Sequence, residues 1–348
     1  MIYRLKSGAK ILLILTIYLL STNFYAQDFH FSQISEAPLL LNPAATGVLN
    51  GKARFQLNQR NQWIGANTQF MTSSFSGDAN FLKPKNGDVA HFGIGGFLYN
   101  DIGGDSKFGI QAASVSLSGI LPINGSGHQL SAGIQSGFTS RKSDLTRVSF
   151  ENQWNGTSFD PLIGSGEPTS LTNFRYFDAS AGLLYQYNGA TTNFRRTDEK
   201  IFLLGASVYH ANNPSLEYTS ILNNKLYRKF VFHSSYTADI PNSNWGYSLS
   251  VVQFFQGPHH ETIFGGTLKN KLQSGTKITG FYQDAFFGFG LYTRWKDAII
   301  PKIYLDFGNF KLGVSYDVTI SQLRKVHKGG SLEFLLSYTI KEKANFKR

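Results

Sequence analysis

Hydrophobic and polar residues alternate at every second position over many segments of the chain. In the segment 309–320, Phe310, Leu312, Val314 and Tyr316 alternate with polar residues and glycine. Successive side chains of a β-strand point to opposite faces, so this pattern predicts strands with one apolar face and one polar face. The segments are about ten residues long, which is the length that a tilted strand needs to cross a bilayer.

The alternation predicts fourteen strands in total, and it is weakest at 107–120 and 260–269. An even number of such strands is typical of a closed, single-chain bacterial barrel. We therefore predict an all-β fold, a transmembrane antiparallel β-barrel of about 14 strands over residues 52–340. The predicted strands are 52–61, 68–81, 89–101, 107–120, 127–141, 175–188, 198–211, 225–238, 245–256, 260–269, 285–296, 298–307, 309–320 and 331–340.

The connections between the predicted strands alternate in length. If the first strand starts in the periplasm, the short connections 122–126, 241–244 and 308–309 are periplasmic turns and the longest connection, 142–174, lies outside. The connection 270–284 is long for a periplasmic turn and does not fit. The alternative all-β fold is a secreted two-sheet sandwich, whose strands average about six residues. Aromatic residues at the strand ends instead favour a belt at the lipid headgroups; they include Tyr185, Tyr187, Tyr209, Tyr236, Trp245, Trp295 and Tyr338.

The first residues predict export. Residues 1–10 carry Arg4, Lys6 and Lys10 and no acid, and an apolar stretch of about ten residues follows. This order, with a small-residue cleavage site after Ala26, is typical of a signal peptide over residues 1–26. The alternative, a membrane anchor, needs about 20 apolar residues. We therefore expect a mature chain in the outer membrane, with neither a disulfide nor a lipidated cysteine, since no Cys occurs.

Residues 27–51 are apolar in part but do not alternate, and Pro38 and Pro43 interrupt any long helix or strand. A fourteen-strand barrel is too wide for its wall side chains to fill. We expect this segment either to fold into the lumen as a plug or to lie along the periplasmic rim as a tether. The candidate plug residues are Leu41, Asn42, Pro43 and Ala44, with a turn at Asn42-Pro43.

The net charge is +11, or 11 − 3 = +8 without the three cations of the signal peptide. The cations are scattered, and their densest group is the basic tail 341–348, so we do not expect a nucleic-acid partner. Within the strands, one set of charges is expected to face the lumen, where they pair across strands or line a wet channel. These candidate lumen charges are Lys302, Asp306, Lys311 and Asp317.

No motif predicts catalysis, a cofactor or a metal. The chain has no G-x-S-x-G nucleophile elbow. His259 and His260 are adjacent in a predicted strand, so they point to opposite faces and cannot easily share one ion. The glycine-rich string 93–96 does not open a helix, so it predicts no phosphate site. We expect a binding protein that is not an enzyme.

Several strings in the chain, taken in order, resemble the PorP/SprF family of type IX secretion and gliding proteins of the Bacteroidetes. The family pattern has a His before Glu333, where this chain has Leu332. The matching strings are Phe31-Ser32-Gln33, Leu41-Asn42-Pro43-Ala44, Gly47, Arg60-Asn61-Gln62-Trp63, Gly93-Ile94-Gly95-Gly96, Asn100-Asp101, Asp160-Pro161-Leu162, Phe177-Asp178-Ala179-Ser180-Ala181-Gly182, Tyr209-His210, Pro214, Gly313-Val314-Ser315-Tyr316-Asp317 and Gly329-Gly330-Ser331.

The resemblance implies an outer-membrane barrel of the type IX machinery. It implies a role in the secretion or surface attachment of a large, adhesin-like surface protein with a C-terminal sorting domain. The outer-membrane lipid and periplasmic components of the machinery are further implied partners. The alternative function is a transport channel for small or hydrophobic solutes, because the segment before the barrel also resembles the hatch of long-chain fatty-acid transporters.

Overall fold

The computed structural model describes the central part of the chain with short gaps, namely residues 31–62, 70–83, 89–104, 106–123, 127–166, 173–189, 191–192, 197–216, 224–273, 285–321 and 329–341. The predicted signal peptide and residues 342–348 of the basic tail lie outside this part. No helix in the described part is long and apolar enough to cross a membrane.

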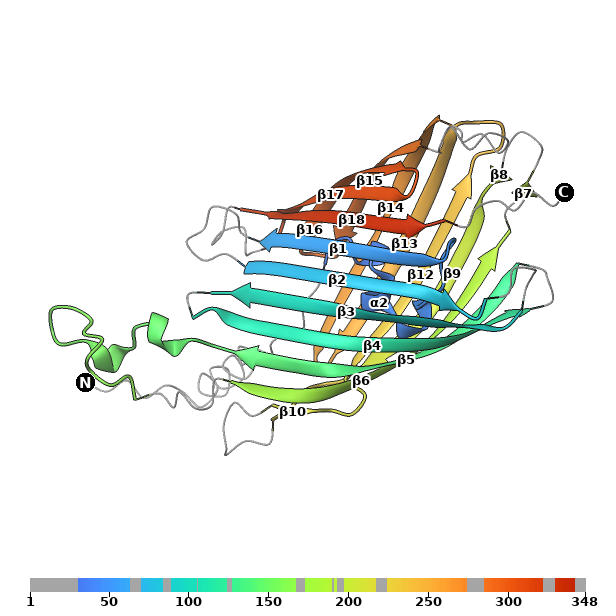
Figure 1. Ribbon diagram of the computed structural model, residues 1–348. Coiled ribbons are helices and arrows are strands. Elements are labelled where there is room, and N and C mark those ends of the chain that lie inside the picture. The colour runs from blue at the N-terminus through green and yellow to red at the C-terminus, as the bar shows by residue number, and fades with distance from the viewer. Residues whose placement is uncertain are drawn as a thin grey trace, which may run out of the picture.

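Fourteen antiparallel strands form one closed barrel, so the predicted fold class is confirmed (Figure 1). The first strand pairs with the last, with Ala53 opposite Ile340, so the wall has no free edge. The strands are β1 (Ala53–Gln62), β2 (Phe70–Phe81), β3 (His91–Gly103), β4 (Phe108–Ile123), β5 (His128–Lys142), β6 (Phe174–Asn188), β9 (Lys200–Tyr209), β12 (Lys229–Asp239), β13 (Trp245–Gln256), β14 (His259–Gln273), β15 (Ala285–Arg294), β16 (Ala298–Phe307), β17 (Phe310–Thr319) and β18 (Ser331–Ile340).

Each strand lies where the alternation predicts one. The two segments with the weakest alternation form long strands, β4 and β14, and β14 takes up the first residues of the connection that did not fit. Pro301 lies within β16, where the pairing with β17 skips Ile300 and Pro301 and resumes in the same register. A proline has no N–H to donate to a neighbouring strand, which accounts for the skipped pairs.

Among the residues that the structure describes, four two-residue strands lie outside the wall, and the sequence did not predict them. One small sheet joins β6 to β9 and the other joins β9 to β12. They are β7 (Thr191–Thr192) with β8 (Thr197–Asp198), and β10 (Ser215–Leu216) with β11 (Asn224–Lys225).

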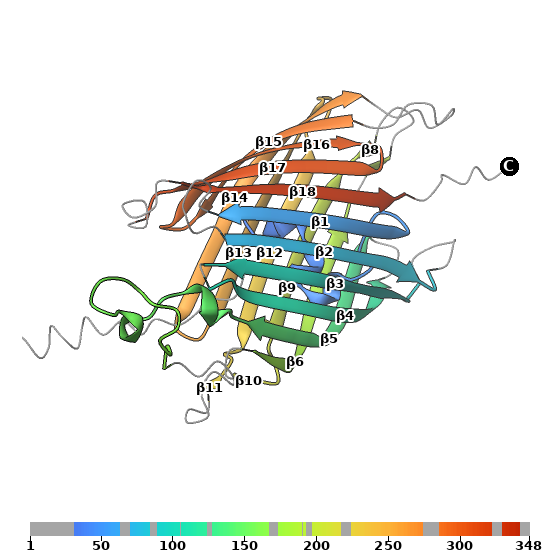
Figure 2. The same cartoon turned by 60° about the vertical axis from the view of Figure 1, so that its left-hand side comes forward.

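The two ends of the barrel differ. β1 begins and β18 ends at one end, which we call the terminal end, and the opposite end is the loop end. The connection between β5 and β6 projects from the loop end well beyond the wall, in green in Figures 1 and 2. The short turn between β16 and β17 lies at the terminal end.

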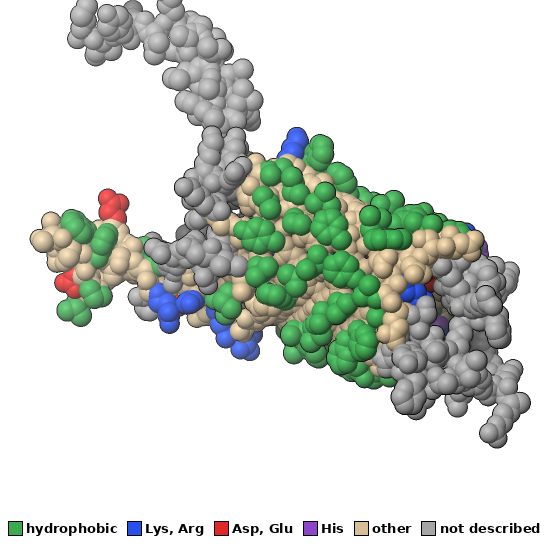
Figure 3. Space-filling view, turned by 90° about the horizontal axis from the view of Figure 1, so that it is seen from above, with side chains coloured by type: hydrophobic (Ala, Val, Ile, Leu, Met, Phe, Trp, Pro, Cys, Tyr) green, Lys and Arg blue, Asp and Glu red, His purple; other side chains and the backbone are tan. Residues whose placement is uncertain are grey.

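The wall separates an apolar outside from a polar inside. On β5, Leu130, Ile134 and Phe138 are exposed on the outer face, whereas Ser131 and Gln135 between them are buried in the lumen. Figure 3 shows hydrophobic side chains covering the outer wall. This distribution is the one a barrel needs when its outside faces lipid.

Candidate functional site: the occupied lumen and the loop end

Residues 31–50, which we call the internal segment, lie inside the barrel (Figure 1). Three short helices form it: η1 (Ile34–Glu36), α2 (Pro38–Leu41) and η2 (Pro43–Ala45). Each of the last two begins with a proline, whose missing N–H and fixed φ suit the first position of a helix. Asn42 caps η2, because its side-chain oxygen accepts a hydrogen bond from the N–H of Ala44 at 2.9 Å.

The internal segment packs in part through apolar contacts. Leu40 and Leu41 belong to a buried cluster with inward side chains of the wall, such as Val231 on β12 and Val252 on β13. Ala44 and Ala45 form a smaller cluster with Leu184 on β6. The segment is therefore held by packing against several strands.

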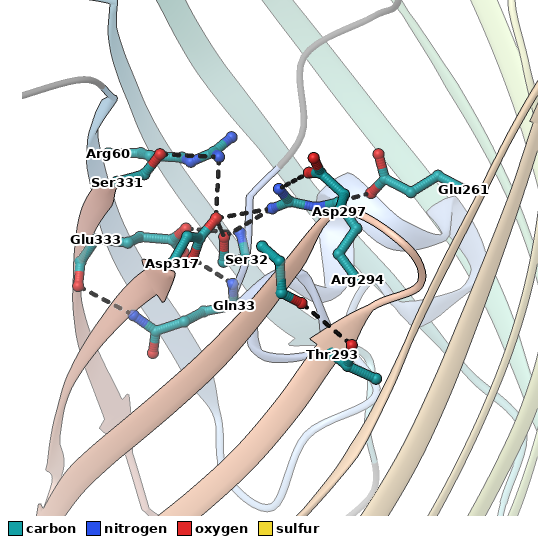
Figure 4. Close-up of polar contacts among 11 residues, drawn as sticks. Ser32, Gln33, Arg60, Glu261, Thr293, Arg294, Asp297, Asp317, Ser331 and Glu333 are labelled. Atoms are coloured by element: carbon teal, nitrogen blue, oxygen red, sulfur yellow. Dashed lines mark hydrogen bonds and ion pairs between the residues drawn. The ribbon is translucent and has the colours of Figure 1, made fainter. Parts of the chain in front are cut away.

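A buried charged cluster binds the start of the segment close to the loop end (Figure 4). The backbone N–H groups of Ser32 and Gln33 donate to the two carboxylate oxygens of Glu333, at 2.7 and 3.0 Å. The hydroxyl of Ser32 donates to Oδ2 of Asp317 at 2.6 Å. One carboxylate from each of β17 and β18 thus fixes the first turn of the segment.

Two arginines also belong to this cluster, and one of them, Arg294, pairs in addition with Glu261 and Asp297. Nη2 of Arg60 lies 3.1 Å from Oδ2 of Asp317, and Nη2 of Arg294 lies 3.0 Å from the same oxygen. The two arginines and the two carboxylates that bind the segment are almost wholly buried. Buried charges are tolerated when they are paired and hydrogen-bonded, and removal of one partner leaves the others uncompensated.

Glu36 forms a second ionic contact at the middle of the lumen. Its carboxylate oxygens accept from Nζ of Lys302 and Nζ of Lys311, both at 2.6 Å. Burial alone would raise the pKa of Glu36, but the two lysines outweigh it and hold that pKa well below its ordinary value. The carboxylate is therefore charged at neutral pH.

The structure places three of the four candidate lumen charges in two groups. Lys302 and Lys311 meet at Glu36, whereas Asp317 lies in the cluster with the arginines. Asp306 is opposite Lys311 in the pairing of β16 with β17. Sequence reasoning missed Glu36, Arg60, Arg294 and Glu333, although the inward polar positions of the strands already contained the last three.

The four candidate plug residues are buried in a slot lined by glycines. The side-chain amide of Asn42 donates to the carbonyl of Leu183 at 2.9 Å and lies 3.1 Å from Nε2 of His233. A Cβ on Gly182 would overlap the side chain of Asn42. A Cβ on Gly133 would likewise overlap the carbonyl of Pro43. Glycine at these positions allows the close approach of segment and wall.

Hydroxyl groups of the wall bind the carbonyls of the same stretch. Ser207 donates to the carbonyl of Leu41 at 2.9 Å, and Ser131 donates to that of Ala44 at 2.6 Å. Close to the terminal end, the N–H of Gly47 donates to Asp78 at 2.8 Å. The segment is thus bound along its length, from the loop end to the terminal end.

The connection between β5 and β6 is the second distinctive feature. Its residues 150–163, which we call the loop knuckle, are held by their own hydrogen bonds. Gln153 donates to the carbonyl of Ile163 at 2.9 Å, and Asp160 accepts from the N–H of Leu162 at 2.9 Å. Trp154 and Phe159 form an isolated β-bridge and an edge-to-face ring pair with centroids 5.1 Å apart.

The loop knuckle exposes large apolar side chains. Trp154 is 49% exposed, Phe159 is 51% exposed and Leu162 is 92% exposed. An ordered loop that presents such side chains away from the membrane is typical of a protein-binding surface.

Within the described ranges, no group of three or more His, Asp or Glu side chains is arranged to hold a metal ion. Leu332, where the family pattern has His, lies on the outer face of β18 next to Glu333. The replacement of His by Leu at position 332 therefore lies on the other face of the wall from the buried cluster at Glu333.

Solved structures that resemble the barrel are diverse. They include BamA from Haemophilus ducreyi lacking POTRA domains 1–3, with 10% identity, a TM-score of 0.43 and coverage of 83% of this chain and 70% of that one. The β domain of the Bordetella autotransporter BrkA has 11% identity, a TM-score of 0.40 and coverage of 84% and 100%. The P. putida toluene transporter TodX has 11% identity, a TM-score of 0.40 and coverage of 87% and 93%. These low similarities carry no functional argument.

The family comparison is more specific. No curated protein matches the chain. The family model described as type IX secretion system membrane protein PorP/SprF, however, matches residues 23–338 of the 348. This match spans the internal segment and almost the whole barrel wall. The chain therefore belongs to the PorP/SprF family of type IX secretion system membrane proteins, and it is an outer-membrane component of that system.

Proposed function

We propose that this barrel supports the secretion or surface attachment of a large, adhesin-like partner protein with a C-terminal sorting domain, and that it does so by binding. The observation that carries the proposal is the loop knuckle, which presents Trp154, Phe159 and Leu162 at the loop end. Its internal hydrogen bonds order it before any partner arrives, and such preorganisation lowers the entropy cost of binding.

The internal segment supports an anchoring role. It acts as a plug, because it is bound to the wall through Glu333, Asp317 and the carbonyl of Leu183. A barrel with a fixed polypeptide in its lumen is suited to hold a partner at its rim. The transport channel predicted as the alternative would need that segment to move, and conductance in planar bilayers separates the two: a plugged barrel stays closed.

The orientation follows from the two ends. The loop end faces the cell surface, and the terminal end faces the periplasmic components of the secretion machinery. Export proceeds with removal of residues 1–26. The mature chain then consists of residues 27–51, the barrel wall 52–340 and the basic tail 341–348. The basic tail lies in the periplasm. Mass spectrometry of the purified barrel tests the cleavage after Ala26.

The test of the function is a triple change in the loop knuckle, Trp154→Ala with Phe159→Ala and Leu162→Ser. The tagged barrel is purified from outer membranes, and the secreted surface protein that co-purifies with the wild-type barrel is identified and measured in the eluate by mass spectrometry. We expect the variant barrel to fold and to lose that protein. A deletion strain that carries only the variant barrel should also export less of the protein.

The matched control is Tyr227→Ala, which removes another exposed aromatic residue at the loop end, outside the loop knuckle. It should retain the partner. The proposal is wrong if the wild-type barrel is recovered alone while the deletion strain still exports and displays the surface protein.

A further inference from the structure

A patch of polar side chains interrupts the apolar outer wall on β1, β2, β3 and β4, which lie side by side (Figure 1). The alternation of each strand places these side chains on the outer face, in line with exposed residues such as Leu57, Phe75 and Leu98. We call them the amide patch, and its members are Gln59, Asn61, Ser73, Asn100 and Gln111.

The amide patch is continuous from strand to strand. Ser73 is directly opposite both Gln59 on β1 and Asn100 on β3. Asn100 is in turn opposite Gln111 on β4. Polar side chains of four strands therefore meet in one row across the wall.

Apolar residues border the amide patch on both sides. Met71 and Ile102 follow it on the outer face toward the loop end, and Met71 is 47% exposed. Toward the terminal end, Ser73 lies eight residues from Phe81, an exposed aromatic residue at the end of β2. At about 3.3 Å per residue and a strand tilt of about 40°, this separation is about 20 Å of height. The apolar belt of such barrels is about 25 Å tall, so the patch lies inside it.

The side chains of the amide patch satisfy one another only in part. Nε2 of Gln59 donates to Oδ1 of Asn61 at 2.8 Å, and the hydroxyl of Ser73 donates to Gln59. Nε2 of Gln111 donates to Oδ1 of Asn100 at 3.1 Å. Among the residues that the structure describes, Nδ2 of Asn61, Nδ2 of Asn100 and Oε1 of Gln111 have no hydrogen-bond partner. Unpaired polar groups are costly in lipid, which offers them no water.

We propose that the amide patch is the contact between two copies of this chain, side by side in the membrane. The patch carries no charge, so two copies of it do not repel each other. It presents unpaired donors together with an unpaired acceptor, which makes the surface complementary to itself. In a two-fold dimer, Asn100 of one protomer donates to Gln111 of its partner, and symmetry repeats the contact in the opposite direction.

This contact is distinct from the proposed function at the loop end, because it uses no residue of the loop knuckle. Association inside a membrane gains little from the removal of water, since lipid tails are as apolar as leucine. Hydrogen bonds between the two walls, and packing of the apolar residues around the patch, therefore hold the protomers together.

The first test uses the absence of cysteine from the chain. Ser73→Cys places a single thiol in the amide patch, and Ser234→Cys places one on the outer face of β12 as the matched control. Outer membranes with either variant are treated with a short thiol-to-thiol crosslinker, and the products are identified by mass spectrometry. We expect Ser73→Cys to give a product that contains two copies of the chain, and Ser234→Cys to remain uncrosslinked.

The second test removes the hydrogen bonds with Asn100→Leu and Gln111→Leu in one variant. Both leucines would face lipid, so the barrel should fold, which heat-dependent gel mobility checks. Energy transfer between labelled copies in vesicles measures association. We expect it to be about tenfold weaker, the effect of two ordinary hydrogen bonds between membrane-spanning segments. Gln253→Leu with Thr262→Val removes another outward polar pair, on β13 and β14, and should associate like wild type.

Two results overturn the proposal. One is equal association of wild type and the variant with leucine at positions 100 and 111. The other is a crosslink from the Ser73→Cys variant to a lipid or to a different protein, with no product that contains two copies of this chain.

Discussion

On β5, Leu130, Ile134 and Phe138 project outward from the wall, whereas Ser131 and Gly133 lie directly against the internal segment. The outer face repeats one kind of contact, apolar side chain against lipid, so one large apolar residue can replace another there. The inner face makes contacts between specific atoms. Substitutions that change a side chain by a similar amount should therefore have different effects on the two faces. Four experiments test this difference.

The largest effect is expected from Asp317→Ala in the buried cluster. The change leaves Arg60 and Arg294 without the oxygen that both contact. Breaking a buried ion pair in this way costs about 3–5 kcal/mol. Urea-dependent unfolding of the barrel in lipid vesicles measures the loss, and Asp317→Asn should recover part of it. Unchanged unfolding would show that the cluster does not stabilise the barrel.

Ile134→Arg places a cation at the middle of the outer face, where Ile134 is 64% exposed. An arginine that faces lipid near the bilayer midplane costs about 2–4 kcal/mol, because it must leave water. The same unfolding assay should show this loss, while Ile134→Leu remains close to wild type. Equal stability of the two variants would mean that this face does not contact lipid.

A pair of glycines compares the two faces most directly. Gly182→Ala adds a methyl group that overlaps the side chain of Asn42, whereas Gly119→Ala adds one where no atom lies within 4 Å. Overpacking of this kind costs about 1–3 kcal/mol. We expect the first variant to unfold at lower urea and the second to match wild type. The reverse order would contradict the placement of Asn42.

Glu36→Gln should have the smallest effect, about 1–2 kcal/mol, because hydrogen bonds to charged groups contribute on that order. The pKa of Glu36 is lowered in the folded barrel, so its contribution is present above the unfolded pKa of about 4.3 and is lost as pH falls toward the folded value. Wild type should therefore lose its advantage over the variant on acidification below that pH. An advantage that stays constant with pH would argue against the contact with Lys302 and Lys311.

Comparison of sequence and structure shows which features are local. Alternation alone placed β14 and β17, because inward and outward positions follow from the two-residue period of a strand. It also placed Lys302 and Lys311 on one face of neighbouring strands. It did not reveal their contact with Glu36, because that residue lies in a segment without alternation and is more than 260 positions away in the chain.

The sequence by itself determined the fourteen strands of the barrel wall, the face on which their residues lie and, through the family match, the secretion system. The tertiary structure alone decided that the segment around Asn42 lies against Gly182 and His233, and that Arg60 and Arg294 share one oxygen of Asp317. The physical reason is the distance along the chain between the residues that interact. Strand formation depends on neighbours two positions apart, whereas closure of the barrel fixes a register that brings distant residues within hydrogen-bonding distance.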